Sequence, residues 1–131
     1  MLARRHVVLA ICAMAAAALV QTASAAAIGR FASANFAAAN KAGDPVVVHI
    51  DATWCPTCKA QKPVLAKLLA GGKYAGFKGF YVDYDSEKPV MRELSAPDRS
   101  TILVFAKGKE VARSVGDTSE EKIAALLDKA L

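Results

Sequence analysis

The pattern of apolar and polar positions predicts alternating strands and helices along most of the chain. Residues 46–50 are an apolar run of mostly β-branched residues interrupted only by His49, which is typical of a strand buried on both faces. After a pair of cysteines, a helical pattern extends to about residue 70 and is closed by two glycines. The apolar face of this helix is formed by Val64, Leu65, Leu68 and Leu69.

The same patterns predict the remaining elements. They are a first helix over residues 26–41, a strand at 80–82, a short helix at 89–94, strands at 101–106 and 110–115 joined by a turn at Gly108, and a last helix capped by Thr118 and Glu121. This order indicates one α/β domain with a central mixed sheet of about four strands, flanked by helices on both faces.

The N-terminal segment has the organisation of an export signal. Arg4 and Arg5 form a short positive region, and an apolar stretch over residues 7–20 follows them. This stretch is shorter than the roughly 18 residues needed to span a bilayer. The interpretation that competes with a signal peptide is an uncleaved amphipathic or anchoring helix.

Small residues at the end of this segment predict where the signal is removed. Alanines occupy the −3 and −1 positions of a cleavage site after Ala25, and cleavage after Ala27 is the alternative. We therefore predict a signal peptide over residues 1–25 and a mature domain over residues 26–131. Such a protein is periplasmic or otherwise extracytoplasmic, a location in which disulfides form and persist.

Composition narrows the range of functions. The chain has 131 residues, of which 54% are hydrophobic, and much of that excess lies in the alanine-rich N-terminal segment. Its 17 Lys and Arg residues against 12 Asp and Glu residues give a formal net charge of +5, and the basic residues are scattered. A nucleic-acid partner is therefore not expected. Because Cys12 lies in the predicted signal, the mature domain keeps Cys55 and Cys58.

The two remaining cysteines stand at the junction of a predicted strand and a predicted helix. Cys55 falls at the helix N-terminus, where free backbone N–H groups and the helix dipole stabilise a thiolate and lower its pKa. Pro56 suits the first helical position because its missing N–H costs nothing there. Cys58 lies one turn further along, within bonding reach. The spacing therefore predicts an attacking Cys55 and a resolving Cys58 in thiol–disulfide exchange.

Other interpretations of the cysteine pair compete with redox activity. A structural disulfide closing so short a loop removes only about 2 kcal/mol of unfolded-state entropy. A zinc site needs four ligands, whereas the mature domain offers two cysteines and His49. Haem attachment needs a histidine directly after the second cysteine, where Lys59 stands. We therefore expect no cofactor. The alternative function is a module that binds or carries a soft metal, Cu(I) or Zn(II), through Cys55 and Cys58 with or without His49.

Trp54 stands directly before the first cysteine, Lys59 directly after the second, and Pro63 lies in the helix that follows. With these residues the sequence resembles the thioredoxin family over about residues 30–131. Further similarities are Asp85 at the end of the next strand, residues 101–105, Gly108 and Gly116. The resemblance implies the thioredoxin fold, a helix kinked at its proline and thiol–disulfide exchange activity. The N-terminal strand of the family is missing or very short in this sequence.

Two stretches near the cysteines depart from the family pattern. Thioredoxins carry a cis-proline that faces the cysteines, and Ser100 stands there instead, so we expect a trans peptide bond between Arg99 and Ser100. The residues between the cysteines differ as well, and they tune the reduction potential in a direction that the sequence does not disclose. We expect client proteins to contact this region, namely Trp54, Pro56, Thr57, Arg99, Ser100 and Thr101.

His49 is a further departure. It stands six residues before Cys55, where the family has a buried aspartate that accepts the proton of the resolving cysteine. A neutral imidazole suits this proton transfer near neutral pH, so His49 joins Cys55 and Cys58 as a candidate catalytic residue. The other interpretation is a packed core histidine bonded to the backbone.

The function predicted from the sequence is therefore that of an exported protein thiol–disulfide oxidoreductase. Its expected partners are client proteins with disulfides or thiols and a separate redox partner that regenerates the cysteine pair. No nucleic acid and no stable membrane insertion after signal cleavage are expected. The sequence does not distinguish a reductase from an oxidase or an isomerase.

Overall fold

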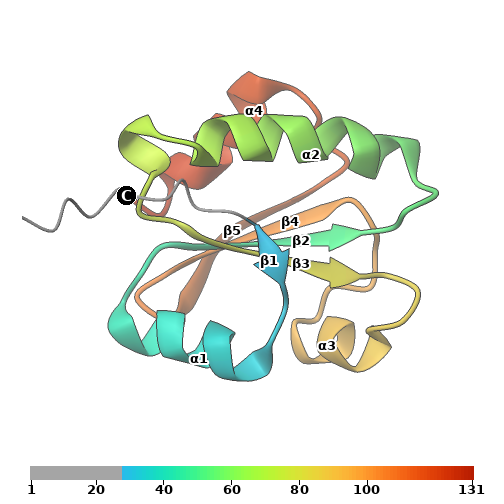
Figure 1. Cartoon of the computed structure of the whole chain (residues 1–131), viewed down its shortest axis with the longest axis horizontal. Helices are drawn as coiled ribbons and strands as arrows, with labels where there is room; N and C mark the ends of the chain where they lie inside the picture. The colour runs from blue at the N-terminus through green and yellow to red at the C-terminus, as the bar shows by residue number, and fades with distance from the viewer. Residues whose placement is uncertain (1–27) are drawn as a thin grey trace, which may run out of the picture.

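The computed structural model describes residues 28–131, which form a mixed five-stranded sheet with helices on both faces (Figure 1). The strands are β1 (Gly29–Arg30), β2 (Val46–Asp51), β3 (Lys78–Asp83), β4 (Thr101–Ala106) and β5 (Lys109–Val115), in the order β1-β3-β2-β4-β5 across the sheet. β3 pairs parallel with β1 and β2, whereas β4 pairs antiparallel with β2 and β5. The central strand β2 is therefore bonded along both edges, and all of its residues are buried, as the mostly apolar run at residues 46–50 predicts.

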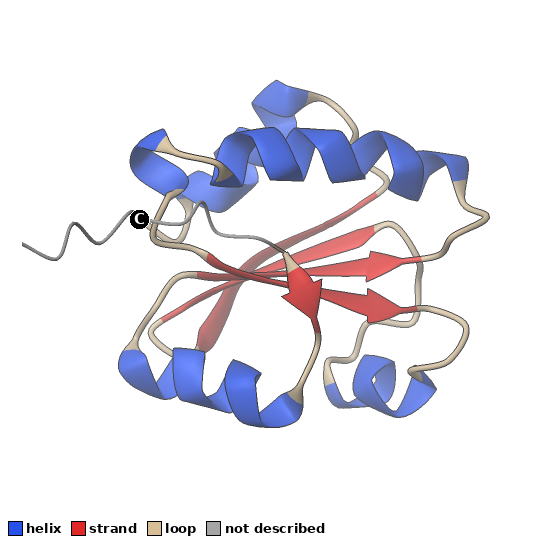
Figure 2. Ribbon diagram, in the orientation of Figure 1, coloured by secondary structure: helices blue, strands red, loops and turns tan. Residues whose placement is uncertain are grey.

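Two helices cover each face of the sheet. Figure 2 shows α1 (Ser33–Ala42) and α3 (Lys88–Glu93) on one face and α2 (Pro56–Leu69) and α4 (Glu120–Asp128) on the other, with the 3-10 turn η1 (Gly72–Tyr74) following α2. The predicted α/β architecture is confirmed. Among the described residues, none of the helices has the length and hydropathy needed to cross a membrane. The predicted signal peptide, residues 1–25, lies outside the described residues.

Alternation along β2 divides its side chains between the two faces of the sheet. The hydrophobic cluster on the side of α1 and α3 takes Val46, Val48 and Ile50. The cluster on the side of α2 and α4 takes Val47. Because successive side chains of a strand point to opposite faces, His49 and Asp51 also point toward α2. This alternation places two polar side chains beneath the helix that carries the cysteines.

The N-terminal part of the domain differs from the sequence prediction. The sheet has one strand more than expected, because β1 pairs in parallel with β3. The first helix begins at Ser33 rather than at residue 26. Pairing with β3 holds this backbone extended, where the alanine content favours a helix. The N-terminal strand of the family is thus present but only two residues long.

Two element ends further along the chain also differ. β3 ends at Asp83, and Asp85 lies in the turn that follows rather than at the strand end. The N-cap of α4 is Ser119 rather than Thr118, and its hydroxyl accepts a hydrogen bond from the Lys122 N–H at 3.2 Å. Element ends are where a local pattern carries the least information, since either neighbouring residue can supply the cap.

Candidate active site

Cys55 occupies the N-cap of α2, just beyond the end of β2. Its backbone is extended, with φ −86° and ψ 116°, its N–H donates to the Ala52 carbonyl at 3.1 Å, and Pro56 follows as the first helical residue. The Cys55 sulfur accepts a hydrogen bond from the Cys58 N–H at 3.2 Å. That N–H is one of the donors that a helix leaves unpaired at its N-terminus. The predicted position of Cys55 at a strand-to-helix junction is confirmed.

Within residues 28–131 both cysteines are free, and Cys55 has the more acidic thiol. Burial raises its pKa, but hydrogen bonds with the Cys58 and Ser100 side chains, with the Cys58 N–H and with Arg99 outweigh burial and lower the pKa to about 7. A large fraction of Cys55 is therefore a thiolate at neutral pH. The thiolate, not the thiol, is the nucleophile in disulfide exchange.

Cys58 is fully buried and is the weaker acid. Burial and the hydrogen bond with the Cys55 sulfur raise the pKa of the Cys58 thiol. The two sulfurs therefore differ in the way that the sequence predicts. Cys55, which is only 2% exposed at the N-cap of α2, has the lowered pKa, whereas Cys58 one turn further along has the raised pKa.

Ser100 brings a hydroxyl group against both sulfurs. Its Oγ lies 3.2 Å from the Cys55 Sγ and 3.2 Å from the Cys58 Sγ. The Arg99–Ser100 peptide bond is trans, as expected in the absence of a proline, and Ser100 has a positive φ of 60°. Only 5% of Ser100 is exposed, so the residue forms the floor of the site rather than its outer surface.

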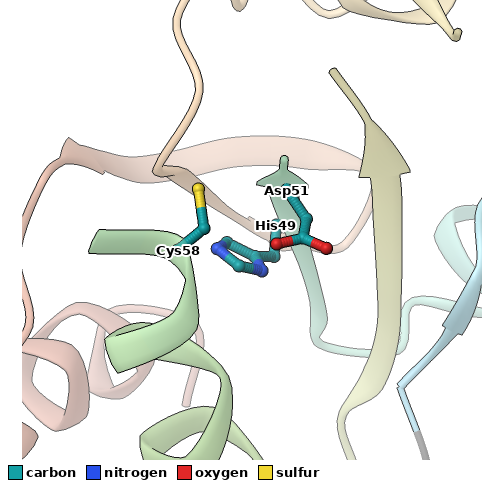
Figure 3. Close-up of side chains that lie close together, drawn as sticks. All are labelled: His49, Asp51 and Cys58. Atoms are coloured by element: carbon teal, nitrogen blue, oxygen red, sulfur yellow. The ribbon is translucent and has the colours of Figure 1, made fainter. Parts of the chain in front are cut away.

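Polar side chains from β2 and α2 lie behind Cys58. Figure 3 shows the His49 ring between the Cys58 thiol and the Asp51 carboxyl group, and one ring nitrogen, the sulfur and one carboxyl oxygen lie within 4.8 Å of one another. The His49 Nε2 is 2.8 Å from the Gln61 Oε1, and the Asp51 Oδ2 is 2.6 Å from the Lys62 Nζ. Because the Lys62 side chain is half exposed, this series of polar groups connects the buried sulfur to the surface.

The hydrogen bonds of Gln61 fix the tautomer of His49. The Gln61 amide nitrogen donates to the Ser100 carbonyl at 3.0 Å and to the Asp117 carbonyl at 2.8 Å, so the amide oxygen faces the imidazole. An oxygen only accepts, and the His49 Nε2 therefore carries the proton while Nδ1 keeps a free lone pair. The ring bonds to the Gln61 side chain rather than to the backbone, and whether His49 accepts a proton or only packs in the core stays a prediction to test.

Burial keeps the imidazole neutral. Desolvation lowers the pKa of His49 below its usual 6.5 and exceeds the opposing effects of the Gln61 hydrogen bond and the Asp51 charge. A neutral imidazole with a free nitrogen is able to accept a proton near neutral pH. With one ring nitrogen within 4.8 Å of the Cys58 thiol, the imidazole is a candidate acceptor for the Cys58 proton.

The group formed by His49, Asp51 and Cys58 also has the residue types of a metal site. One carboxyl oxygen, Asp51 Oδ1, is buried without a hydrogen-bond partner. The other oxygen contacts the Lys62 ammonium at 2.6 Å, and a second positive charge there repels a cation. The His49 Nε2 faces the Gln61 oxygen at 2.8 Å. The group therefore fits proton transfer better than it fits a metal ion.

Trp54 covers the outer side of the site. Its Nε1–H donates to the Asp85 carboxylate at 2.9 Å, and its ring meets the Tyr84 ring edge-on with 6.1 Å between centroids. The guanidinium carbon of Arg99 lies 4.8 Å from the centroid of the indole ring, a cation–π contact. Trp54 is nonetheless 52% exposed, so it offers a fixed apolar surface beside the cysteines.

The remaining predicted contact residues differ in accessibility. Pro56 is exposed and Thr57 is partly exposed, so both are open to an approaching protein. Thr101 is buried, and its hydroxyl donates to the Asp98 carbonyl at 2.6 Å, which holds the loop before β4. A contact between these residues and a client stays a prediction.

Sequence reasoning missed Asp51, Gln61 and Lys62. The sequence spacing could have predicted two of them, Asp51 and Gln61. Asp51 follows His49 by two positions on a strand, so both side chains point to the same face. Gln61 follows Cys58 by three positions on a helix and is fully buried with it. A polar residue at the inward-facing spacing of a known site residue is therefore the pattern to look for.

The sheet order, the cysteine at the helix N-cap and the second cysteine one turn later define a redox protein of the thioredoxin fold class. The family model described as Thioredoxin matches residues 27–129. Thioredoxin C-2 of Corynebacterium nephridii is 36% identical over 86 residues, which cover 65% of this chain and 78% of that protein. Thioredoxin of Chlamydia trachomatis is 34% identical over 84 residues, which cover 64% of this chain and 80% of that protein.

A solved structure agrees with these sequence relatives. Trxlp from Edwardsiella tarda superimposes with a TM-score of 0.75 at 32% sequence identity, and the match covers 77% of this chain and 98% of that chain. The chain belongs to the thioredoxin family. It is a thiol–disulfide oxidoreductase, and the thioredoxin fold predicted from the sequence is confirmed.

Proposed function

We propose that the protein is an exported oxidoreductase that exchanges disulfides with client proteins, with Cys55 as the attacking and Cys58 as the resolving cysteine. The observation that carries the proposal is the environment of the Cys55 sulfur. This sulfur caps α2, accepts the Cys58 N–H at 3.2 Å and has a pKa lowered to about 7, while the adjacent Cys58 thiol stays protonated. One reactive thiolate and one protected thiol are what a two-step exchange requires.

The first step is attack of the Cys55 thiolate on one sulfur of a client disulfide. A mixed disulfide between Cys55 and the client forms, and the other client sulfur leaves as a thiolate that takes a proton from water. In the second step, Cys58 gives its proton to His49 and attacks the Cys55 sulfur. The Cys55–Cys58 disulfide forms and the second client thiolate leaves. The client gains two electrons, the protein loses two, and a separate redox partner must restore the thiols.

Client binding is assigned to the surface around Cys55. Trp54 supplies an exposed apolar ring, and Pro56 and Thr57 are accessible beside it. Arg99 lies against the same ring and contributes a positive charge. Ser100 and Thr101 lie beneath this surface, where they support the loop and the sulfurs.

Catalysed reduction of insulin by a dithiol donor tests the proposal. The purified protein is expected to accelerate precipitation of the insulin chains. Cys55→Ser is expected to abolish this acceleration, and Cys58→Ser is expected to accumulate a mixed disulfide with the client. Cys12→Ser, which changes a cysteine of the predicted signal, is the matched control and retains activity. Absence of activity with every dithiol donor would refute the proposal.

Export is tested separately from the redox chemistry. The proposal predicts that the chain produced in a Gram-negative bacterium is found in the periplasmic fraction and begins at Ala26. Replacing Ala25 with glutamine removes the small residue at the −1 position and is expected to block cleavage. A full-length chain retained in the cytoplasm would contradict export while leaving the redox activity open to its own test.

The alternative function is binding or transport of a soft metal through Cys55 and Cys58 with or without His49. The proximity of His49 and Cys58 favours it, and the Lys62 ammonium beside Asp51 weighs against it. Mass spectrometry of the natively purified protein distinguishes the two functions. A stoichiometric metal supports the alternative, whereas a metal-free form lighter by two protons supports the redox function.

A further inference from the structure

Ser100 contacts both active-site sulfurs through one oxygen atom. The Ser100 Oγ is 3.2 Å from the sulfur of Cys55 and 3.2 Å from the sulfur of Cys58. A hydroxyl group has a single proton to donate and two lone pairs to accept with. It therefore donates to only one sulfur at a time, and the protonation of the two cysteines decides which.

The pKa values of the two thiols set the direction of these hydrogen bonds. Cys55 is the thiolate, so the Ser100 O–H donates to it. Cys58 keeps its proton, and its sulfur lies 3.2 Å from the Ser100 Oγ and 3.8 Å from the Ile50 carbonyl, beside the Cys55 thiolate with which it also forms a hydrogen bond. A hydrogen bond to an ionised sulfur is stronger than one between neutral groups. The hydroxyl thus donates to the thiolate while it also contacts the buried thiol.

The backbone of Ser100 holds this hydroxyl in place. Its N–H donates to the Ile50 carbonyl at 2.9 Å, and its carbonyl accepts from the Gly116 N–H at 3.0 Å and from the Gln61 amide at 3.0 Å. These three bonds attach the residue to β2, to the loop after β5 and to α2. They also maintain the left-handed backbone, with φ 60°, that a serine adopts only when its surroundings require it.

We propose that Ser100 is a positioning residue whose hydroxyl stabilises the reduced form of the cysteine pair and thereby raises its reduction potential. This inference rests on the proposed exchange function. Oxidation removes two electrons and one proton from the Cys55 thiolate and the Cys58 thiol and leaves a neutral disulfide. The disulfide has no negative charge, so the hydrogen bond from the Ser100 hydroxyl to the Cys55 sulfur weakens. Proteins in which the reduced form is selectively stabilised are stronger oxidants.

Other groups near the sulfurs do not replace this effect. Arg99 also bonds the Cys55 sulfur, but it approaches from the exposed side, where solvent screens its charge. His49 lies behind Cys58 and is neutral. Ser100 is the buried donor shared by both sulfurs, so its hydroxyl is the group whose removal is expected to shift the equilibrium.

The test is the redox equilibrium of the purified protein with glutathione, measured for Ser100→Ala and Ser100→Gly in a Cys12→Ser background. Loss of one hydrogen bond to a charged sulfur is expected to shift the equilibrium about tenfold toward the disulfide. That shift corresponds to a reduction potential lower by about 30 mV. The glycine variant accepts a positive φ without strain, so it supplies the measurement if the alanine variant folds poorly.

Ser95→Ala is the matched control, because Ser95 also has a positive φ, of 50°, but is exposed on the surface. Its equilibrium constant is expected to equal that of the parent protein. Equilibrium constants of both Ser100 variants that equal the parent value, or that shift toward the dithiol, would overturn the inference. Insulin reduction by the parent protein is measured in parallel. Its absence refutes the exchange function, whereas activity combined with unchanged potentials refutes only the role of Ser100.

Discussion

At the scale of single residues, the proposed role of His49 is to accept the proton of the resolving cysteine. The imidazole lies between the Cys58 thiol and the Asp51 carboxyl group, and the Gln61 oxygen fixes its protonated nitrogen (Figure 3). One ring nitrogen, the Cys58 sulfur and one Asp51 oxygen lie within 4.8 Å of one another, and Asp51 pairs with the half-exposed Lys62. This arrangement predicts that His49 affects the second step of exchange and leaves the first step unchanged.

Replacing His49 with asparagine keeps a polar partner for Gln61 but removes the titratable nitrogen. Release of a client from the Cys55 mixed disulfide is expected to slow by about 10²-fold at neutral pH, the usual contribution of a general base. Attack of Cys55 on the client is expected to keep its rate. Rapid-quench measurement of both steps from pH 6 to 9 checks this. Exchange rates equal to those of the parent protein across this range would dismiss the proton-accepting role.

The sequence predicts correctly those parts of the site whose residues are neighbours along the chain. Cys55, Pro56 and Cys58 are placed correctly because one strand-to-helix junction determines all three. The contact of Ser100 with the sulfurs depends on how β4 enters the sheet, and no local pattern contains that information. The absence of a proline predicts the trans peptide bond but not the hydrogen bonds of the hydroxyl that replaces it.

At the scale of elements, the start of α4 gives a test of capping. The Ser119 hydroxyl accepts the Lys122 N–H at 3.2 Å, whereas the adjacent Thr118 precedes the cap. Ser119→Ala is expected to lower the free energy of unfolding by about 1 kcal/mol, because an N–H at the helix terminus loses its partner. Urea denaturation measures the change as a lower midpoint at an unchanged slope.

Thr118→Ala is the control for this prediction. It removes a similar side chain one position earlier and is expected to shift the urea midpoint much less. An equal loss in both variants would show that the two residues share the cap. A larger loss for the threonine variant would reverse the assignment.

Strands with a strong pattern of buried side chains are predicted well from the sequence. A strand that forms only because its backbone pairs with a neighbouring strand is not. β2 is recognised because its apolar run reflects burial on both faces. β1 is missed because only two residues pair with β3, and alanine-rich sequence around them favours a helix. The start of α1 at Ser33 follows from the same pairing, since the backbone cannot be extended and helical at once.

At the scale of the whole molecule, the buried His49 links stability to pH. Its pKa is lowered in the folded protein, mainly by burial, whereas in the unfolded chain it is close to 6.5. Below pH 6.5 the unfolded state therefore binds a proton that the folded state does not. The protein is therefore expected to have its full stability, as far as His49 is concerned, above pH 6.5. Its free energy of unfolding is expected to decrease as the pH falls from 6.5 toward 5.

Urea denaturation at pH 7, 6 and 5 measures this dependence. The His49→Asn variant is expected to show a flatter dependence in this window. Asp83 and Asp128 have lowered pKa values as well, but they contribute only as the pH falls through the acidic range of carboxyl groups. A steep loss of stability between pH 7 and 5 that persists in the variant would place the titrating group elsewhere.

The whole domain positions one reactive sulfur, that of Cys55, where β2 ends and α2 begins. Two hydrophobic clusters hold the helices on opposite faces of β2, and the polar groups of the site gather at the end of that strand. The general architecture follows from the order of elements. The chemistry of the site depends on side chains that meet only in the folded chain, above all Ser100 and Gln61.

Ultraviolet titration of the reduced protein tests the reactive thiolate most directly. Thiolate absorbance at about 240 nm is followed with pH, and the signal of a Cys55→Ser variant is subtracted to isolate Cys55. The difference is expected to rise with a midpoint close to pH 7, in agreement with the lowered pKa of this thiol. A midpoint at or above about 8.5, the value of an ordinary cysteine, would contradict the assignment of Cys55 as the attacking sulfur.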